Sequence, residues 1–385
     1  MSLSIGIVGL PNVGKSTLFN ALTKKGVPAE NYPFCTIDPS VGIVPVPDER
    51  LTKLSEISKS KKTIPAVVEF VDIAGLVKGA SEGAGLGNKF LSHIREVDVI
   101  CHVVRNFADA SVVHVAGEIN PLHDKDIIET ELILADLQTL DKQTEPFGYA
   151  TGKPQGRFTK DDFTKWSLIL KLKEGLNNGH NAREIITDSE EKDIVRDLQL
   201  LSMKPVLYVM NVSEQELSNL TQDSRNFGLA NDNSGNQLNT VVICAKTEAE
   251  LASLSPEEQK EYLAALGVSA SGLDLLIQKT YQLLGLISFL TTGEKEARAW
   301  TIRAGMKAPE AAGTIHTDFA KKFIKADVVS YEDFINPMRE ADGPASPNTA
   351  SRGGWKKARE IGKVRQEGKE YIVKDGDVIE FKIGS

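Results

Sequence analysis

The chain has 385 residues, of which 41% are hydrophobic and 25% are charged, and its formal net charge is −8. This length suggests two or three domains, and the composition is that of an ordinary globular protein. Three distant cysteines without CxxC spacing, Cys35, Cys101 and Cys244, indicate neither a disulfide framework nor a zinc site. The chain has no apolar run of the roughly 18 residues that span a membrane and no signal-peptide pattern, so we expect a cytoplasmic protein that does not enter membranes.

The first motif in the chain is GLPNVGKST, residues 9–17, which directly follows an apolar run. Four residues separate Gly9 from Gly14, and Lys15 and Ser16 follow at once, which is the spacing of a loop that holds a nucleotide β-phosphate between a strand and a helix. Lys15 would reach the β- and γ-phosphates, and the Ser16 hydroxyl would bind Mg²⁺. We therefore predict that the phosphates contact Asn12, Val13, Gly14, Lys15, Ser16 and Thr17.

Two further segments are suited to complete the phosphate site. Residues 31–38 form a turn-like stretch, from which the Thr36 hydroxyl can bind Mg²⁺ when the loop closes. A strongly apolar strand, 66–71, ends at Asp72, whose carboxylate can hold a water bound to Mg²⁺. Gly75 follows, and its N–H can approach the γ-phosphate because no side chain blocks the way.

These motifs together resemble a known family. GLPNVGKST with DIAGLVKGASEGAGLGNKFLSHIREVD is similar to the Obg-type branch of the translation-factor GTPases, and later features narrow the resemblance to the YchF/Ola1 family over essentially the entire chain. The resemblance implies a doubly wound α/β sheet of the P-loop type, an α-helical coiled-coil insert and a C-terminal β-grasp domain like ubiquitin, called TGS.

The segment that would read the base departs from the GTPase pattern. A strand over 205–210 leads into Asn211, Val212 and Glu214, where a GTPase has Asn-Lys-x-Asp with an Asp that binds guanine N1–H and the 2-amino group. Adenine has neither of these donors, so the altered segment favours ATP over GTP. Cys244 and Ala245, in a later apolar run, resemble the family's last nucleotide motif, which lines the base.

A change of periodicity marks an α-helical insert at about 127–202, and glycines and Pro154 over 148–156 predict a hairpin tip. The apolar residues of the insert form its own core in this interpretation, and partner binding by the tip is the alternative. A helix over 273–284 would close the nucleotide domain. The expected domains are thus residues 1–285 and 286–385.

The C-terminal part carries the pattern of the TGS resemblance. We expect a strand over 297–302, a helix over 319–324 and a hairpin over 371–381 with an Asp-Gly turn. Such modules usually bind RNA or ribosomes, so the resemblance implies that the partner is a ribosome, through its large subunit, or RNA, and not DNA. A basic cluster fits phosphate contact or, equally, a solvated face; it consists of Lys356, Lys357, Arg359, Lys363 and Arg365.

The sequence predicts a hydrolase of ATP to ADP and phosphate that needs Mg²⁺ and acts as a monomer. Lys15 and Gly75 would stabilise the reacting phosphate. Leu76 stands where many GTPases have a glutamine that orients the attacking water, so another group must do so. His114 is the candidate by its chemistry and by the family resemblance, although a partly buried structural histidine is the alternative. The alternative functions are a GTPase and a ribosome-binding protein whose nucleotide site is only a sensor. A kinase for a small metabolite is a more distant alternative, because the sequence shows no acceptor site.

Overall fold

The computed structural model describes residues 3–24, 26, 40–73, 85–107, 120–152, 156, 158–219, 239–266, 268, 270–336 and 354–384. The chain divides into two compact units. The first comprises Met1–Val44 and Glu69–Leu276, and the second comprises Pro45–Val68 and Ile277–Ser385. Within the described ranges, no helix is both long and apolar enough to cross a membrane.

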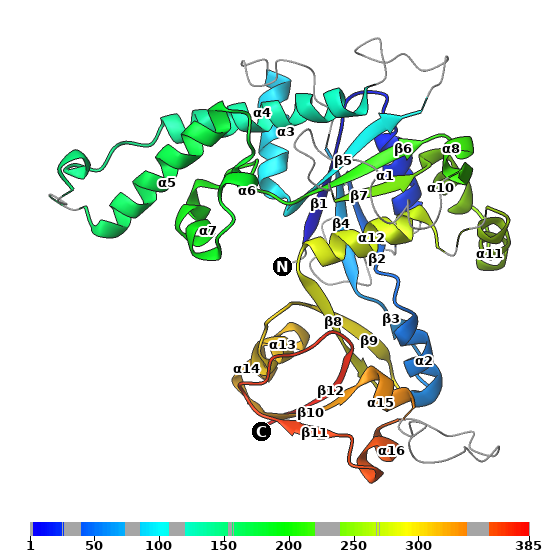
Figure 1. The fold of residues 1–385 in the computed structure, drawn as a ribbon. Coiled ribbons are helices and arrows are strands. Elements are labelled where there is room, and N and C mark those ends of the chain that lie inside the picture. Colours follow the sequence, from blue (N-terminus) through cyan, green and yellow to red (C-terminus); the bar gives the residue numbers. More distant parts are fainter. Residues whose placement is uncertain are drawn as a thin grey trace. The chain divides into compact units, whose positions relative to one another are not determined.

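A six-stranded sheet forms the centre of the first unit (Figure 1). Its strands are β1 (Ser4–Val8), β2 (Val41–Pro45), β4 (Val67–Asp72), β5 (Val99–Asn106), β6 (Val206–Val212) and β7 (Thr240–Ile243). They lie in the order β2-β4-β1-β5-β6-β7, and all ladders from β4 to β7 are parallel. β5 is buried along almost its whole length, as a central parallel strand covered on both faces should be.

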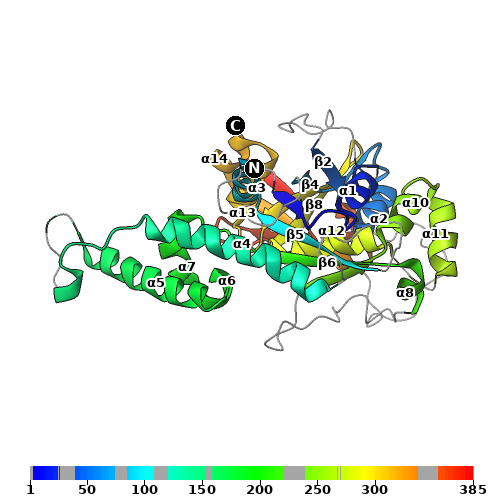
Figure 2. The ribbon, with the colours of Figure 1, turned by 90° about the horizontal axis from the view of Figure 1, so that it is seen from above.

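Helices cover both faces of this sheet, so the predicted doubly wound architecture is confirmed (Figures 1 and 2). One face is covered by α3 (Gly85–Glu96) and α4 (Pro121–Asp141), whose Phe90, Ile94 and Leu132 pack with Ile100 and Tyr208 of the sheet. Outside the insert, the other described helices of this unit are α1 (Lys15–Lys24), α8 (Glu214–Asn219), α10 (Ala245–Leu251), α11 (Pro256–Ala265) and the first part of α12 (Gly272–Leu283).

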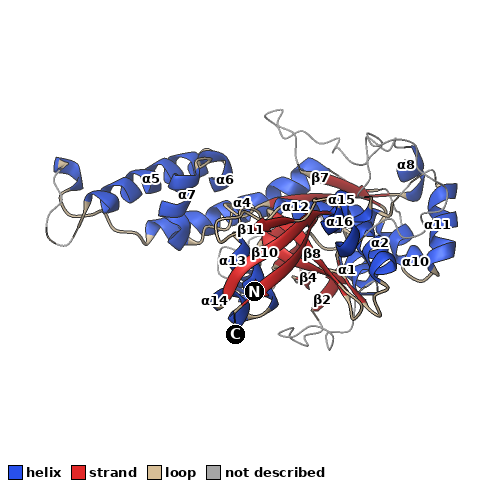
Figure 3. Cartoon of the chain, turned by 90° about the horizontal axis from the view of Figure 1, so that it is seen from below, coloured by secondary structure: helices blue, strands red, loops and turns tan. Residues whose placement is uncertain are grey.

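The helical insert extends from this sheet as an arm (Figure 2), and Figure 3 shows only helices and loops among its described residues. After α4 it contains η3 (Tyr149–Thr151), α5 (Lys160–Asn177), α6 (Ala182–Ile185), α7 (Ser189–Val195) and η4 (Arg196–Leu198). A capping box of Thr159 and Asp162 begins α5. The arm has its own core around Leu140, Trp166 and Leu172, as predicted for its apolar residues.

The second unit contains another six-stranded sheet. Its strands are β3 (Thr63–Ile64), β8 (Leu286–Thr292), β9 (Ala297–Arg303), β10 (Phe323–Ser330), β11 (Arg365–Glu367) and β12 (Asp377–Ile383), in the order β11-β10-β12-β8-β9-β3. β12 pairs parallel with β8, and antiparallel pairs flank them on both sides. The first and last strands of 286–384 thus lie side by side in the middle, which is the β-grasp arrangement.

Short helices accompany this sheet. They are α2 (Glu49–Ser58), α13 (Ala308–Ile315), α14 (Thr317–Lys321), α15 (Tyr331–Ile335) and α16 (Trp355–Glu360). Alanines 308, 311 and 312 of α13 are fully buried against Phe289 and Ile302 of the sheet. Small side chains on this helix let it lie close to the strands.

The prediction of a hairpin over 371–381 is wrong. Its Asp-Gly turn exists, but the turn bonds to β8: Gly376 N–H donates to Ser288 O, and Ser288 N–H donates to the Asp375 carboxylate at 2.8 Å. The strand after the turn, β12, therefore pairs with β10 and β8 rather than with residues 371–374. The helix expected over 319–324 is also shifted, because α14 ends at Lys321 and β10 begins at Phe323.

Residues 45–68 are an unexpected part of the second unit. The sequence placed them in the nucleotide-binding domain, whereas they contribute α2 and β3 to the other sheet. β3 pairs parallel with β9, and α2 buries Leu51 and Leu54. Arg50 donates to both Asp48 and Asp375, the latter at 2.7 Å, which fixes the start of α2 to the Asp-Gly turn.

Candidate functional site

The loop between β1 and α1 has the backbone that its glycines predict. Gly14 has φ +99°, and a Cβ atom there would lie 2.3 Å from Asn211 Nδ2. At Gly9 a Cβ atom would lie 2.4 Å from the carbonyl oxygen of Val103. Real contacts are never so short, so both positions require glycine for close approach of β5 and β6 to the loop.

Asn12 is exposed and has φ +63°, a left-handed conformation that asparagine tolerates better than most residues. A residue in the left-handed conformation beside residues in the right-handed conformation turns successive backbone N–H groups toward a common centre, which suits an anion. The N-terminus of α1 follows immediately, with Ser16 and Thr17 exposed in its first turn. The described loop therefore fits a phosphate group, as the motif predicts.

Lys15 and Asp72 form the charged centre of the site. The Lys15 ammonium donates to Leu10 O at 2.8 Å, so it is held by the loop itself. Burial lowers the pKa of Lys15, and the nearby Asp72 carboxylate opposes this change. Burial likewise raises the pKa of Asp72, at the end of β4, and Lys15 opposes that change. Lys15 and Asp72 thus influence each other's pKa across the site.

Asn211 joins the loop to the base-binding side of the site. Its Nδ2 donates to Val13 O at 2.9 Å, and its Oδ1 accepts from Ala245 N–H at 2.9 Å. The side chain is 4% exposed. Val13 and Ala245 are themselves buried, so this amide holds the ends of β1, β6 and β7 in fixed positions.

The segment after Asn211 offers little to a guanine base. Val212 is 5% exposed and packs with Leu217, Val242 and Cys244, so its side chain belongs to the core. Glu214 is exposed at the first position of α8. Its charge also helps to raise the pKa of Tyr262 on α11, after the larger effect of burial.

The structure thus brings together Val13, Gly14, Asn211 and Ala245 by direct contact, and it places Lys15 near Asp72. Three predicted residues, Thr36, Gly75 and His114, lie outside the described residues, and their roles stay predictions.

His102 belongs to no sequence motif, and it lies on β5 beside Val8 of β1. It is buried, its ring centre is 5.6 Å from that of Tyr208, and burial lowers its pKa to about 4. Its Nε2 has no hydrogen-bond partner among the described residues. The sequence signal that could have identified His102 is the presence of a polar residue inside the apolar run ICHVV.

The C-terminal basic cluster is largely neutralised within the second unit. Arg359 binds Glu380 at 2.8 Å and also approaches Asp327, while Lys363 lies 3.6 Å from Asp333. Lys357 and Arg365 also have acidic partners. Lys356 is exposed. The structure therefore gives little support to a phosphate-binding role for this cluster.

Two family models match the chain. The model YchF-GTPase_C, described as a protein of unknown function (DUF933), covers residues 286–384. A second model, described as 50S ribosome-binding GTPase, covers residues 4–137.

Full-length relatives are also similar. The chain is 49% identical over 382 residues to the ribosome-binding ATPase YchF of Bacillus subtilis and 45% identical over 382 residues to that of Escherichia coli O157:H7. In both cases 99% of each chain is covered. The solved structure of the Schizosaccharomyces pombe YchF GTPase is similar with a TM-score of 0.79 and 38% identity, covering 99% of this chain and 98% of that one.

Proposed function

Because the chain belongs to the YchF family, we propose that it is a ribosome-associated nucleoside triphosphatase that hydrolyses ATP to ADP and phosphate. The bacterial relatives carry the name ribosome-binding ATPase YchF. The phosphate-binding loop with its buried tie to Asn211 supports nucleotide binding in this chain. Hydrolysis would switch the loops that contain Thr36 and Gly75.

We infer the preference for ATP over GTP from the surroundings of Val212. A GTPase lysine at this position covers the base with its stem, but Val212 is packed in the core and cannot do so. Glu214 replaces the aspartate that would accept from guanine N1–H and the 2-amino group, and its longer side chain starts from the exposed end of α8. Adenine requires neither contact, so it loses nothing at this segment.

Mg²⁺ fits the phosphate end of the site, because hydroxyl and carboxylate oxygens are the ligands it prefers. Ser16 is exposed beside the loop and Asp72 ends the adjacent strand. In this proposal Ser16 and Thr36 bind the ion directly and Asp72 holds one of its waters. The ion offsets the charge of the phosphates.

The chain's own groups have separate roles in the proposal. Lys15 exchanges its bond with Leu10 O for the β- and γ-phosphates, and its half-buried position makes the ammonium a strong partner for them. The Gly75 N–H contacts the γ-phosphate. His114 orients the attacking water, since Leu76 has no group that can.

Nucleotide preference is tested by titration calorimetry with ATP and GTP in the presence of Mg²⁺. ATP should bind more tightly to the unmodified chain, and Glu214→Asp should narrow the difference by restoring part of the guanine clamp. Roughly 1–3 kcal/mol is the scale of such bidentate base recognition. The matched control is Glu257→Asp, at an exposed position of α11, which should leave the ratio of the two affinities unchanged. Tighter binding of GTP would favour the GTPase alternative, which the name of the yeast relative also carries.

The second unit would supply the contact with the large ribosomal subunit, and the protein would act as a monomer. Co-sedimentation with isolated subunits tests the first point, and light scattering tests the second. Turnover that is the same with and without ribosomes would instead favour a protein in which the nucleotide site is only a sensor.

A further inference from the structure

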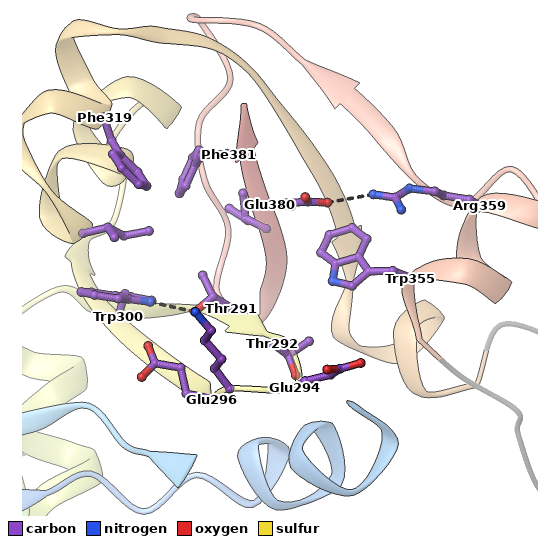
Figure 4. A pocket seen from close by; sticks show the side chains of 14 residues that line it. Thr291, Thr292, Glu294, Glu296, Trp300, Phe319, Trp355, Arg359, Glu380 and Phe381 are labelled. Carbon is purple, nitrogen blue, oxygen red and sulfur yellow. Dashed lines mark hydrogen bonds and ion pairs between the residues drawn. The ribbon is translucent and has the colours of Figure 1, made fainter. Parts of the chain in front are cut away.

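The second unit contains a pocket of about 780 Å³ on the sheet between α13–α14 and α16 (Figure 4). Aromatic side chains form much of its wall: Trp300 from β9, Phe319 from α14, Trp355 from α16 and Phe381 from β12. All four are only partly buried. Pockets of this size hold a drug-sized molecule, so there is room for a few residues of a peptide but not for a folded domain.

Two of these aromatic rings already hold cations. The guanidinium carbon of Arg298 lies 3.9 Å from the ring centre of Trp300, and that of Arg359 lies 5.4 Å from the ring centre of Trp355. The indole of Trp300 is further fixed by its Nε1, which donates to Thr291 at 2.9 Å. Aromatic faces attract cations through their quadrupole, and Trp does so best. The two contacts show that rings of this wall accept a cation on a face, and the rings of Phe319 and Phe381 line the same pocket.

The turn between β8 and β9 adds negative charge to the lining. Glu294 and Glu296 have no side-chain hydrogen bond or ion pair with any described residue. Lys295 lies between them and is exposed, while Arg359 is already paired with Glu380. Two free carboxylates beside an aromatic wall favour a cationic ligand, and they would repel a phosphate backbone.

We propose that this pocket binds an extended basic segment of a partner protein, with a Lys or Arg side chain between the aromatic wall and the two carboxylates. The ring faces supply cation–π attraction, and Glu294 and Glu296 supply charge-assisted hydrogen bonds. The inference stands on the pocket alone and does not depend on nucleotide hydrolysis.

Fluorescence anisotropy tests the proposal on the full-length protein at about 0.15 M salt, where long-range charge effects are screened. The probe is a fluorescein-labelled seven-residue peptide with three arginines separated by glycine and serine. We expect Glu294→Lys/Glu296→Lys to weaken binding about tenfold or more, because attraction becomes repulsion. Phe319→Ala should weaken it about threefold, the scale of one exposed cation–π contact.

Matched controls separate the pocket from overall charge. Glu145→Lys/Glu261→Lys changes net charge equally at two exposed sites of the first unit, and Phe147→Ala removes an aromatic side chain that is 67% exposed on the insert. Both should keep the affinity within about twofold. Equal losses in the two double variants, or no loss in either, would overturn the proposal. A single-stranded RNA heptamer that displaces the peptide would overturn it in favour of nucleic acid.

Discussion

Asn211 shows how a single side chain holds the nucleotide site together. Its amide connects Val13 O and Ala245 N–H, two backbone groups that lie more than thirty residues from it in the chain. Asn211→Ala leaves both groups unpaired in a buried place, at about 1–3 kcal/mol for each. We expect ATP affinity to fall about tenfold or more, together with a lower free energy of unfolding, measured by calorimetry and urea titration.

Asn211→Asp is the informative companion to this variant. It keeps the oxygen that accepts from Ala245 N–H, but it replaces the donor to Val13 O with a carboxylate oxygen that would face the Val13 carbonyl. An Ala variant with normal affinity and stability would mean that Asn211 does not position the loop.

His102 makes a prediction about pH. Its pKa is about 4 in the folded protein because of burial, with Lys125, Arg183 and Lys15 adding to the decrease and Glu129 opposing it. The ordinary value is near 6.5, so between these values the unfolded chain binds a proton that the folded protein does not. The contribution of His102 to the free energy of unfolding is fully present above pH 6.5. It is lost as the pH falls toward 4, and the loss is roughly 3 kcal/mol at most.

His102→Gln isolates this effect, because the other titrating groups remain. Buried Asp136, for example, has a raised pKa, which changes stability in the opposite direction. Urea titrations at pH 7 and 4.5 should show a smaller loss of unfolding free energy in His102→Gln than in the unmodified protein. Equal losses of unfolding free energy in the two proteins would show that His102 is protonated at pH 4.5 in the folded protein as well as in the unfolded chain.

The phosphate-binding loop could be predicted from sequence because its requirements are local. Gly9, Gly14, Lys15 and Ser16 need only their spacing and the strand before them. The role of Asn211 in linking the loop to Ala245 could not be predicted, since it depends on how β1, β6 and β7 align. His102 was missed for a similar reason: an isolated histidine in an apolar strand gives no sign of what it faces.

At the scale of elements, a buried carboxylate of α4 holds the segment by which the helical arm returns to the sheet. Asp136 of α4 accepts from Leu201 N–H at 2.7 Å, from Ser202 N–H at 2.8 Å and from the Ser202 hydroxyl at 2.6 Å. Asp136→Ala should release this return segment, at a cost of about 3 kcal/mol or more. Hydrogen exchange at Leu201 and Ser202 should become at least about tenfold faster, since protection follows local stability.

The control for this variant lies on the same helix. Asp141 is paired with Lys173 near the end of α4, but its side chain is 70% exposed, so Asp141→Ala should leave the exchange rates almost unchanged. ATP affinity should stay the same in both variants. Unchanged exchange in Asp136→Ala would place the attachment of the arm elsewhere.

Element pairing explains which parts of the second unit the sequence could predict. The strand 297–302 and the Asp375-Gly376 turn follow from local pattern, and both exist. The partner of β12 could not be inferred in this way, because β8 lies almost ninety residues earlier in the chain. The turn before β12 hydrogen-bonds to β8 rather than to the residues that precede the turn. α2 likewise has an ordinary amphipathic pattern that does not say which sheet will cover Leu51 and Leu54.

At the scale of the whole molecule, α2 belongs to the second unit although it lies early in the sequence, and this decides where the chain must be cut to separate the two units. A chain cut after residue 285 keeps α2 but loses β8 and β9, against which it packs. Leu51 and Leu54, now 2% and 0% exposed, would then face water. We expect this truncated chain to aggregate or to lose stability.

A second deletion avoids the problem. Val46 N–H donates to Ala66 O at 2.8 Å, and Asp72 N–H donates to Ser40 O at 2.8 Å, which is the pattern of an antiparallel pair between β2 and β4. Residues 47–65 can therefore be replaced by Asn-Gly, a two-residue loop that suits such a pair. Residues 1–285 with this replacement should be monomeric by light scattering, unfold cooperatively and bind ATP within about threefold of the full-length protein, since the loop 9–17, Asn211 and Ala245 are all retained. A simple truncation that is equally monomeric and stable would contradict the assignment of 45–68 to the second unit, because α2 would then need no cover from β8 and β9.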